Sequence, residues 1–181
     1  MKAFFISGVC GVGKSAIIPY LKKLLPSEKY DVRDFDERGV PDGADHSWRK
    51  AEVKKWLEVA KESAGRGVVT VICGFVKSKD FEDLVSGDLE AEILLLDADS
   101  ETIRKRLVGR YSKNGVFDET QKVIGRSVND FIESNVYYCN VMRKECTEEG
   151  CRIINTSACT PEEVAQKVVA LNLEVKYQFG S

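Results

Sequence analysis

The stretch ISGVCGVGKSA, residues Ile6–Ala16, decides the fold that we expect for this chain. It satisfies the pattern G-x-x-x-x-G-K-[ST] with Gly8, Gly13, Lys14 and Ser15, and the strand-like run AFFIS comes directly before it. Glycines at this spacing let successive backbone N–H groups turn toward phosphate oxygens, and the following helix adds the positive end of its dipole. The stretch therefore predicts a phosphate-binding loop between a strand and a helix.

A glycine-rich turn that merely joins a strand to a helix would explain neither the Lys14-Ser15 pair nor its spacing from Gly8. Lys14 can reach the outer phosphates of a nucleotide, and the Ser15 hydroxyl can ligate magnesium. The residues expected to contact the nucleotide in this loop are Gly8, Gly11, Val12, Gly13, Lys14, Ser15 and Ala16. We interpret Cys10 as a small residue that the loop tolerates, because the sequence gives it neither a base nor a resolving thiol.

The charge and length of the chain set broad limits on its function. It has 181 residues, with 27 Lys and Arg against 29 Asp and Glu, and a formal net charge of -2 at pH 7. This balance leaves no broad positive field for nucleic acid or anionic lipid, and no apolar run approaches the roughly 18 residues of a membrane span. We expect one domain over residues 1–176 and a tail at residues 177–181.

The six cysteines form no C-x-x-C pair, and no secretory signal peptide precedes them. This favours reduced thiols in a cytoplasmic protein. A zinc site at Cys139, Cys146 and Cys151 is not favoured, because these spacings differ from those of the usual paired ligands. The sequence leaves open a redox role for Cys10 or Cys73.

Short apolar runs alternate along the chain with longer segments of helical spacing. The strand-like runs lie at residues 3–7, 30–35, 68–73, 91–97 and 151–155. The helical segments lie at residues 14–25, 47–64, 100–108, 118–146 and 161–171. This alternation predicts an α/β domain with a parallel sheet.

The region before the longest predicted helix is a candidate lid. The loop YSKNGVF, residues 111–117, contains the turn signal Asn114-Gly115 and would suit a mobile flap. We expect the helix at residues 118–146 to begin with Asp118 as its N-cap. The lid would then span about residues 111–126.

The segment LDADSETIRKRLVGR, Leu96–Arg110, resembles the strand, helix and lid entrance of adenylate kinases and related small P-loop kinases. The resemblance implies that Arg106 packs against the adenine of ATP and that Arg110 contacts phosphates and stabilises the transferred phosphoryl group. On its own, the same segment would be an exposed basic helix face. Arg126 is a candidate further lid arginine, with a surface pair to Asp130 as the equal alternative.

The second strand ends in RDFDERG, which places Asp34 and Asp36 at its carboxyl end, on one side if the strand continues. This pair is similar to that of shikimate and gluconate kinases. The resemblance implies that Asp34 positions magnesium through water, and that Asp36 holds or deprotonates the acceptor. The alternative is that one of the two carboxylates caps the following turn.

The segment HSWRKAEVKKW contains Trp48-Arg49-x-x-Glu52, which is similar to the F-R-x-x-E of shikimate kinases. The resemblance implies that Arg49 grips an acceptor carboxylate or phosphate, since a guanidinium matches both groups bidentately. Arg49 and Glu52 would share a helix face, and we interpret Trp48 and Trp56 as packing residues. The acceptor-binding segment would span about residues 36–66.

The third strand ends in CGFVK, where adenylate kinases place D-G-[FY]-P-R. Gly74 matches that pattern and is expected at the acceptor site, whereas Cys73 and Lys77 replace its aspartate and arginine. The missing carboxylate argues against an ordinary adenylate kinase. After the last strand, residues 156–158 are placed by the resemblance at the rim of the adenine pocket, and Thr160 is expected to cap the following helix.

These observations predict a three-layer P-loop NTPase fold with a five-stranded parallel sheet, helices on both faces, and a short lid. The expected activity is transfer of the ATP γ-phosphoryl group, with Mg2+, to a small anionic acceptor such as a nucleoside monophosphate or a hydroxylated metabolite. The alternatives are an ATP-hydrolysing switch or assembly ATPase, and a nucleotide-binding module without turnover. The identity of the acceptor and the oligomeric state stay open at this point.

Overall fold

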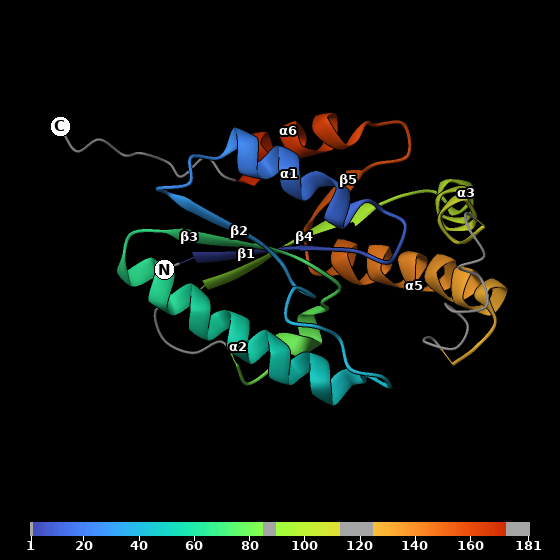
Figure 1. Ribbon diagram of the computed structural model, residues 1–181, viewed down its shortest axis with the longest axis horizontal. Helices are drawn as coiled ribbons and strands as arrows, with labels where there is room; N and C mark the ends of the chain where they lie inside the picture. The colour runs from blue at the N-terminus through green and yellow to red at the C-terminus, as the bar shows by residue number, and fades with distance from the viewer. Residues whose placement is uncertain (1, 85–89, 113–124, 173–181) are drawn as a thin grey trace.

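The computed structural model describes residues 2–84, 90–112 and 125–172 (Figure 1). Its centre is a five-stranded sheet in the order β2-β3-β1-β4-β5, and all four neighbouring pairs are parallel. The strands are β1 (Lys2–Ser7), β2 (Tyr30–Asp34), β3 (Val69–Cys73), β4 (Glu90–Asp97) and β5 (Arg152–Asn155). The predicted parallel sheet is therefore confirmed, with each strand within one residue of its apolar run.

Helices cover both faces of the sheet, which confirms the three-layer architecture. On one face, α1 (Lys14–Leu24) packs against α6 (Pro161–Asn172), as Figure 1 shows at the top of the molecule. On the other face, α2 (His46–Gly65) packs against β3, β1 and the short 3-10 helix η1 (Ser78–Phe81). Among the described residues, no helix has the length and apolarity needed to cross a membrane.

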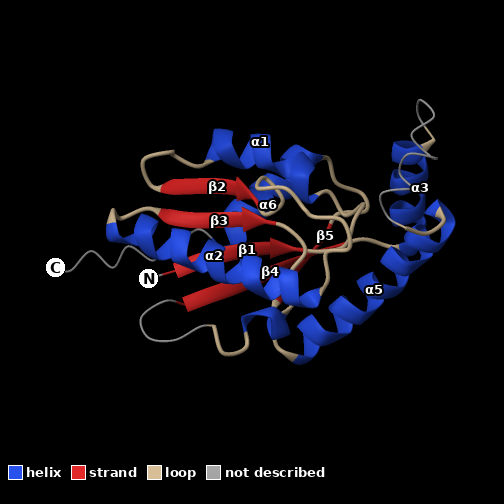
Figure 2. Cartoon of the chain, turned by 60° about the horizontal axis from the view of Figure 1, so that its bottom comes forward, coloured by secondary structure: helices blue, strands red, loops and turns tan. Residues whose placement is uncertain are grey.

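Two further helices flank the carboxyl end of β4. Helix α3 (Ser100–Tyr111) follows β4 through the cap residue Asp99, and it packs against α5 (Val128–Glu148). Figure 2 shows all strands pointing the same way, with α3 and one end of α5 beyond the arrowheads. The loops that leave β1, β2 and β3 reach the same edge, which is where open parallel sheets bind ligands.

The prediction of one helix over residues 118–146 is wrong at its start. Gly125 and Arg126 lie in a turn and a bend, Gly125 has a left-handed φ of 66°, and α5 begins only at Val128. The Ser127 hydroxyl accepts a hydrogen bond from the Asp130 N–H at 3.0 Å and caps the helix. Asp118 and most of the expected lid, residues 113–124, lie outside the described residues.

The packing between β2 and β3 depends on a residue without a side chain. A Cβ atom at Gly74 would lie 2.1 Å from Cβ of Phe35, whose side chain is only 2% exposed. Phe35 is held in place because its backbone carbonyl accepts a hydrogen bond from Nε1 of the buried Trp56 at 3.2 Å. Gly74 is therefore required here for close packing, whatever its part in ligand binding.

We expect Gly74→Ala to lower the free energy of unfolding by about 1–3 kcal/mol, because the new methyl group overpacks against Phe35. Chemical denaturation followed by circular dichroism measures the change. Gly109→Ala is the matched control, since Gly109 lies within α3 and a Cβ there meets nothing within 4 Å. That control should keep or raise stability. Equal stability of the Gly74 variant and the wild type would contradict this packing role.

Candidate functional site

The loop between β1 and α1 contains glycines in backbone conformations that other residues rarely adopt. Gly8 has a φ of 147°, and a Cβ atom there would lie 2.5 Å from the Leu96 carbonyl oxygen on β4. Gly13 precedes α1 with a left-handed φ of 105°, and its carbonyl accepts the N–H groups of Ala16 and Ile17. Ser15 is exposed in the first turn of α1. The predicted loop thus stands between a strand and a helix N-terminus, as the sequence indicates.

Lys14 folds back over the loop that it follows. Its ammonium donates to the carbonyl oxygens of Gly8 at 2.7 Å and Val9 at 2.9 Å. The surrounding protein removes water from this ammonium and lowers its pKa, while the negative charge of Asp36 acts in the opposite direction. The ammonium is therefore held at the loop and lies within electrostatic reach of the predicted acceptor residue.

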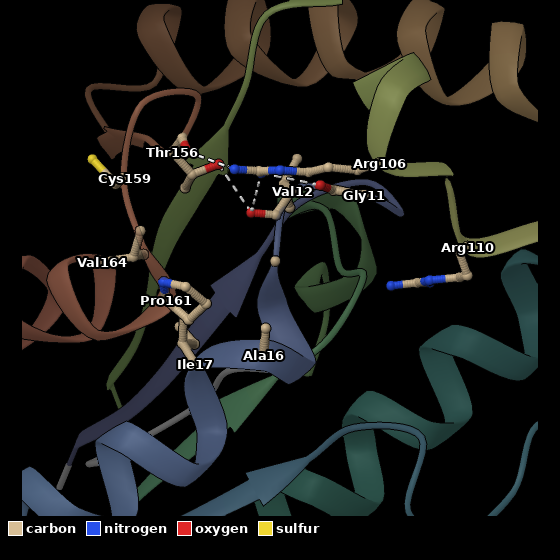
Figure 3. A pocket seen from close by; sticks show the side chains of 11 residues that line it. Gly11, Val12, Ala16, Ile17, Arg106, Arg110, Thr156, Cys159, Pro161 and Val164 are labelled. Carbon is tan, nitrogen blue, oxygen red and sulfur yellow. Dashed lines mark hydrogen bonds between the residues drawn. The ribbon is translucent and has the colours of Figure 1, made fainter. Parts of the chain in front are cut away.

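A cavity of about 240 Å³ lies beside the loop, between α1, α3 and the segment after β5 (Figure 3). Gly11, Val12, Gly13 and Ala16 of the predicted nucleotide set line it, together with Arg106 and Arg110. We call it the donor-side cavity. Its remaining walls come from Thr156, Cys159 and the start of α6, so the segment expected at the adenine rim does reach it.

Arg106 joins two walls of the donor-side cavity (Figure 3). One guanidinium nitrogen lies 3.2 Å from the Gly11 carbonyl oxygen and 3.1 Å from Thr156 Oγ1, and the other donates to the Thr156 carbonyl at 2.7 Å. The buried Thr156 hydroxyl in turn donates to the Val12 carbonyl at 3.0 Å. Arg106 is thus fixed at the cavity edge. Arg110 lines the same cavity but lies apart from the contacts between Arg106 and Thr156.

A second and larger cavity, of about 560 Å³, lies on the other side of the loop. Val9 and Cys10 of the loop line it, and so do Asp36, Arg49 and Arg126. We call it the acceptor-side cavity. The structure therefore brings together three of the five residues predicted at the acceptor site, whereas Asp34 and Gly74 do not line this cavity.

Asp34 and Asp36 are not related by strand alternation, because β2 ends at Asp34 and Asp36 lies in the following turn. Asp34 Oδ1 accepts a hydrogen bond from the Asp36 N–H at 3.0 Å, so Asp34 caps the turn as the alternative interpretation had it. Desolvation by the surrounding protein, and then the charge of Asp34, raise the pKa of Asp36. Arg49 and Lys14 lower it, which places both cations near this carboxylate.

Arg49 and Glu52 do not act as a pair. The Arg49 guanidinium lies 4.7 Å from the ring centroid of Phe75, in the acceptor-side cavity. Glu52 is 3% exposed and forms salt bridges with Arg38 at 3.3 Å and Lys55 at 2.8 Å. Glu52 therefore binds Arg38 in the loop before α2, and Arg49 lines the cavity without it.

The two tryptophans of α2 pack as expected. Trp56 is buried, and Trp48 meets Phe35 edge to face at 6.2 Å. Trp48 also lines the acceptor-side cavity.

Arg126 lies before α5 rather than in its first turns. Its guanidinium lies 5.3 Å from the ring centroid of Phe131, and no salt bridge to Asp130 exists in the part of the chain described. Asp130 instead accepts from the Ser127 hydroxyl at 2.6 Å. The surface pair considered from the sequence is therefore absent from the described contacts, and Arg126 lines the acceptor-side cavity.

Cys73 occupies the strand end where the related pattern has an aspartate. Burial raises the pKa of its thiol to about 12, so this sulfur is a neutral thiol at physiological pH. Such a group offers neither a thiolate for redox chemistry nor a carboxylate for a metal. The described residues contain no cluster of three or more His, Cys, Asp or Glu side chains suited to a metal ion.

The two residues predicted to serve magnesium carry oxygen donors of the kind that this ion prefers. The exposed Ser15 hydroxyl and the Asp34 carboxylate, with one oxygen engaged by the Asp36 N–H, are hard oxygen donors. Mg²⁺ is commonly held by one or two such groups together with waters and nucleotide phosphates. A cage of protein ligands is not required for this ion.

Asn135 is a candidate functional residue that the sequence did not reveal. Its side-chain oxygen accepts a hydrogen bond from the Cys10 N–H at 2.9 Å, and its amide nitrogen donates to the Phe131 carbonyl at 2.8 Å. It also lines the acceptor-side cavity. A single asparagine within a helix carries no sequence signal, so only the packing of α5 against the loop identifies it.

We expect Asn135→Leu to weaken binding of a non-hydrolysable ATP analogue about five- to tenfold, because the Cys10 N–H loses its acceptor and the loop is less ordered. Isothermal titration calorimetry measures the affinity. Asn129→Leu is the matched control on the same helix, where the asparagine is exposed and does not line either cavity. Equal affinities for the two variants would rule out a positioning role for Asn135.

Solved structures, but no curated sequences, are similar to this chain. No protein-family model and no curated protein sequence matches the chain. Similar solved structures include a shikimate kinase from Acinetobacter baumannii in complex with shikimate, with 16% identity, 98% of this chain and 95% of that chain covered, and a TM-score of 0.53.

A sugar kinase from Janibacter sp. has 16% identity, coverage of 94% of this chain and 93% of that chain, and a TM-score of 0.54. A thymidylate kinase from Candida albicans has 14% identity, coverage of 93% and 89%, and a TM-score of 0.53. These three likenesses indicate the same fold as the five parallel strands and the loop after β1. The chain has the fold of the small P-loop kinases of the adenylate kinase-like group.

Proposed function

We propose that this protein is a phosphotransferase that moves the γ-phosphoryl group of ATP to a small anionic acceptor, a nucleoside monophosphate or a hydroxylated metabolite. One observation carries the proposal. Two cavities border the same phosphate loop, the donor-side cavity through Gly11–Gly13 and the acceptor-side cavity through Val9 and Cys10. A nucleotide in the first would direct its terminal phosphate toward the second, which is the geometry of in-line transfer.

On the donor side, the backbone of the loop and Lys14 bind the phosphates, and Arg106 borders the adenosine end. Ser15 and Asp34 would hold Mg²⁺, which neutralises charge on the phosphate oxygens when it is bound. Arg110, at the far end of the cavity, is assigned to the charge that develops on the transferred group. Gly8 keeps the loop close to β4.

On the acceptor side, Arg49 binds the anionic group, and Asp36 takes the proton when the attacking group is a hydroxyl. The acceptor oxygen forms a bond to the γ-phosphorus, the bond from that phosphorus to the β-phosphate oxygen breaks, and ADP leaves with the electron pair. Arg126 borders the same cavity. Gly74 contributes by placing Phe35 and Phe75, two of the cavity walls, beside Asp36.

The likeness to shikimate, sugar and thymidylate kinases supports a kinase, and the differences among those three leave the acceptor class open. All six cysteines are free thiols, which supports action in the cytoplasm.

The function is tested by measuring ADP formation with ATP and Mg²⁺ against a panel of nucleoside monophosphates, hydroxy acids and sugars. We expect ADP to appear only with a matching acceptor, and Lys14→Met to lose at least a hundredfold in rate. Lys61→Met is the matched control, since Lys61 is an exposed residue of α2. If the rate of ADP formation without any acceptor equals the rate with each acceptor of the panel, the result would instead support an ATP-hydrolysing switch.

The raised pKa of Asp36 predicts the pH dependence of the reaction. With a hydroxyl acceptor the base must be ionised, so kcat/KM for that acceptor falls as the pH falls through this pKa, at a higher pH than for an ordinary aspartate. Asp34→Asn removes a charge that raises this pKa, while its amide oxygen can still accept from the Asp36 N–H. We expect the acid limb of the profile to move to lower pH, together with a lower maximal rate.

Asp36→Asn is the companion variant, and we expect it to lose about 10²- to 10⁴-fold in rate and to lack this limb. An acid limb at the same pH in wild type and Asp34→Asn would exclude Asp36 as the titrating base.

A further inference from the structure

The walls of the acceptor-side cavity carry more positive charge than one carboxylate on a substrate would balance. Among the described residues, the permanent cations that line it are Arg49, Lys77, Lys79 and Arg126, and the single carboxylate is that of Asp36. His46 also lines the cavity, with its Nδ1 2.9 Å from the buried Asp80 carboxylate. The charge is therefore concentrated here, although the whole chain has a formal net charge of only -2.

Three of these cations lie on aromatic rings rather than on carboxylates. The Arg49 guanidinium lies 4.7 Å from the ring centroid of Phe75. The Lys77 ammonium lies 4.9 Å from that of Tyr138. The Arg126 guanidinium lies 5.3 Å from that of Phe131. Within the described ranges, none of the three forms a salt bridge with a carboxylate. Stacking on a ring orients a cation and leaves its N–H groups available to an anion.

The three cations come from separate parts of the chain. Arg49 lies in the first turns of α2, Lys77 directly precedes η1, and Arg126 directly precedes the cap of α5. The backbone of Lys77 is fixed because its N–H donates to the buried Asp80 at 2.7 Å. The cavity therefore offers donors from several sides, an arrangement that favours an anion with several oxygens over a planar one with two.

We infer that the acceptor carries a phosphate monoester. At pH 7 this group has a charge of about -1.5 to -2 and three strong acceptor oxygens, whereas a carboxylate has a single charge and two oxygens. The body of the acceptor is apolar or ring-shaped, since Phe35, Trp48 and Phe75 form much of the remaining wall. The inference rests on the proposed function only in taking this cavity as the acceptor site.

Binding tests the inference without any transfer reaction. Phenyl phosphate and benzoate share a ring and differ in the anion, and Trp48 lines the cavity while Trp56 is buried, so tryptophan fluorescence reports occupancy. We expect phenyl phosphate to bind at least tenfold more tightly than benzoate at pH 7.5. Trp48→Phe should abolish the signal, which assigns the change to the cavity. Equal affinities for the two compounds would overturn the inference.

Variants of the stacked cations supply the second arm. Lys77→Gln and Arg126→Gln should each weaken phenyl phosphate binding about five- to tenfold and change benzoate binding less. The matched control is Lys61→Gln, an exposed α2 residue about 18 Å along the helix from Arg49. Circular dichroism verifies folding of each variant. Unchanged phenyl phosphate affinity in both cavity variants would likewise overturn the inference.

Transfer assays then distinguish the two sources of a phosphate monoester. Phosphorus NMR of the product separates a new anhydride, formed on a nucleoside monophosphate, from a new ester, formed on the hydroxyl of a ring-shaped compound such as a sugar phosphate. Either product supports the inference. Binding of phenyl phosphate as expected, without ADP formation from any phosphorylated acceptor, would support this anion site and overturn the proposed kinase function.

Discussion

The backbone of the phosphate loop is held by side chains from three distant segments, and both cavities depend on this restraint. Arg106 of α3 bonds to the Gly11 carbonyl, Thr156 after β5 bonds to the Val12 carbonyl, and Asn135 of α5 accepts from the Cys10 N–H. A loop of glycines has high conformational entropy, so external partners are needed to keep its N–H groups converging on one point. The segments that hold the loop are also the walls of the two cavities.

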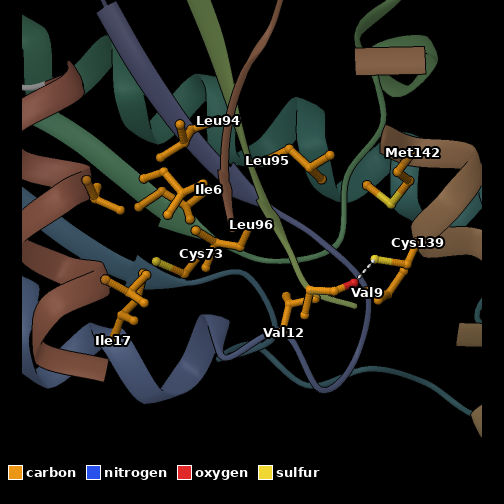
Figure 4. Packing of buried hydrophobic residues seen from close by; sticks show 14 of the residues in the cluster. Ile6, Val9, Val12, Ile17, Cys73, Leu94, Leu95, Leu96, Cys139 and Met142 are labelled. Atoms are coloured by element: carbon orange, nitrogen blue, oxygen red, sulfur yellow. Dashed lines mark hydrogen bonds between the residues drawn. The ribbon is translucent and has the colours of Figure 1, made fainter. Parts of the chain in front are cut away.

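The position of α5 in turn depends on a salt bridge at the end of β4. Arg143 contacts the nearly buried Asp97 through two nitrogens at 2.7 and 2.8 Å, and Cys139 lies 3.1 Å from the same carboxylate. Figure 4 shows Cys139 and Met142 of α5 near Leu95 and Val9 in the apolar cluster beside the loop. This contact joins a nearly buried carboxylate to an arginine whose side chain is 39% exposed, and its two charge-assisted hydrogen bonds fix the register of the helix. That register places Asn135 against the loop.

The sequence predicted the parts of this molecule that depend on local chemistry. The strands follow from their apolar runs, and the loop geometry follows from glycines whose left-handed φ values other residues rarely adopt. Prediction from the sequence failed where the packing of two elements against each other determines the structure. Asp36 leaves the strand because β2 ends at Asp34, and Arg126 turns toward Phe131 because Ser127 caps α5 nine residues later than expected. Asn135 has no local pattern at all.

The neutral thiol of Cys73 and the stacked cations belong to one electrostatic arrangement. Where the related pattern has a carboxylate at the end of β3, the raised pKa of Cys73 keeps that position uncharged, so Asp36 is the carboxylate whose charge acts on Lys14. The cations Arg49 and Lys77 lie on aromatic rings, which stabilise positive charge without neutralising it. The cavity thereby keeps a positive potential that an anionic ligand can neutralise, and the same rings give that ligand an apolar surface.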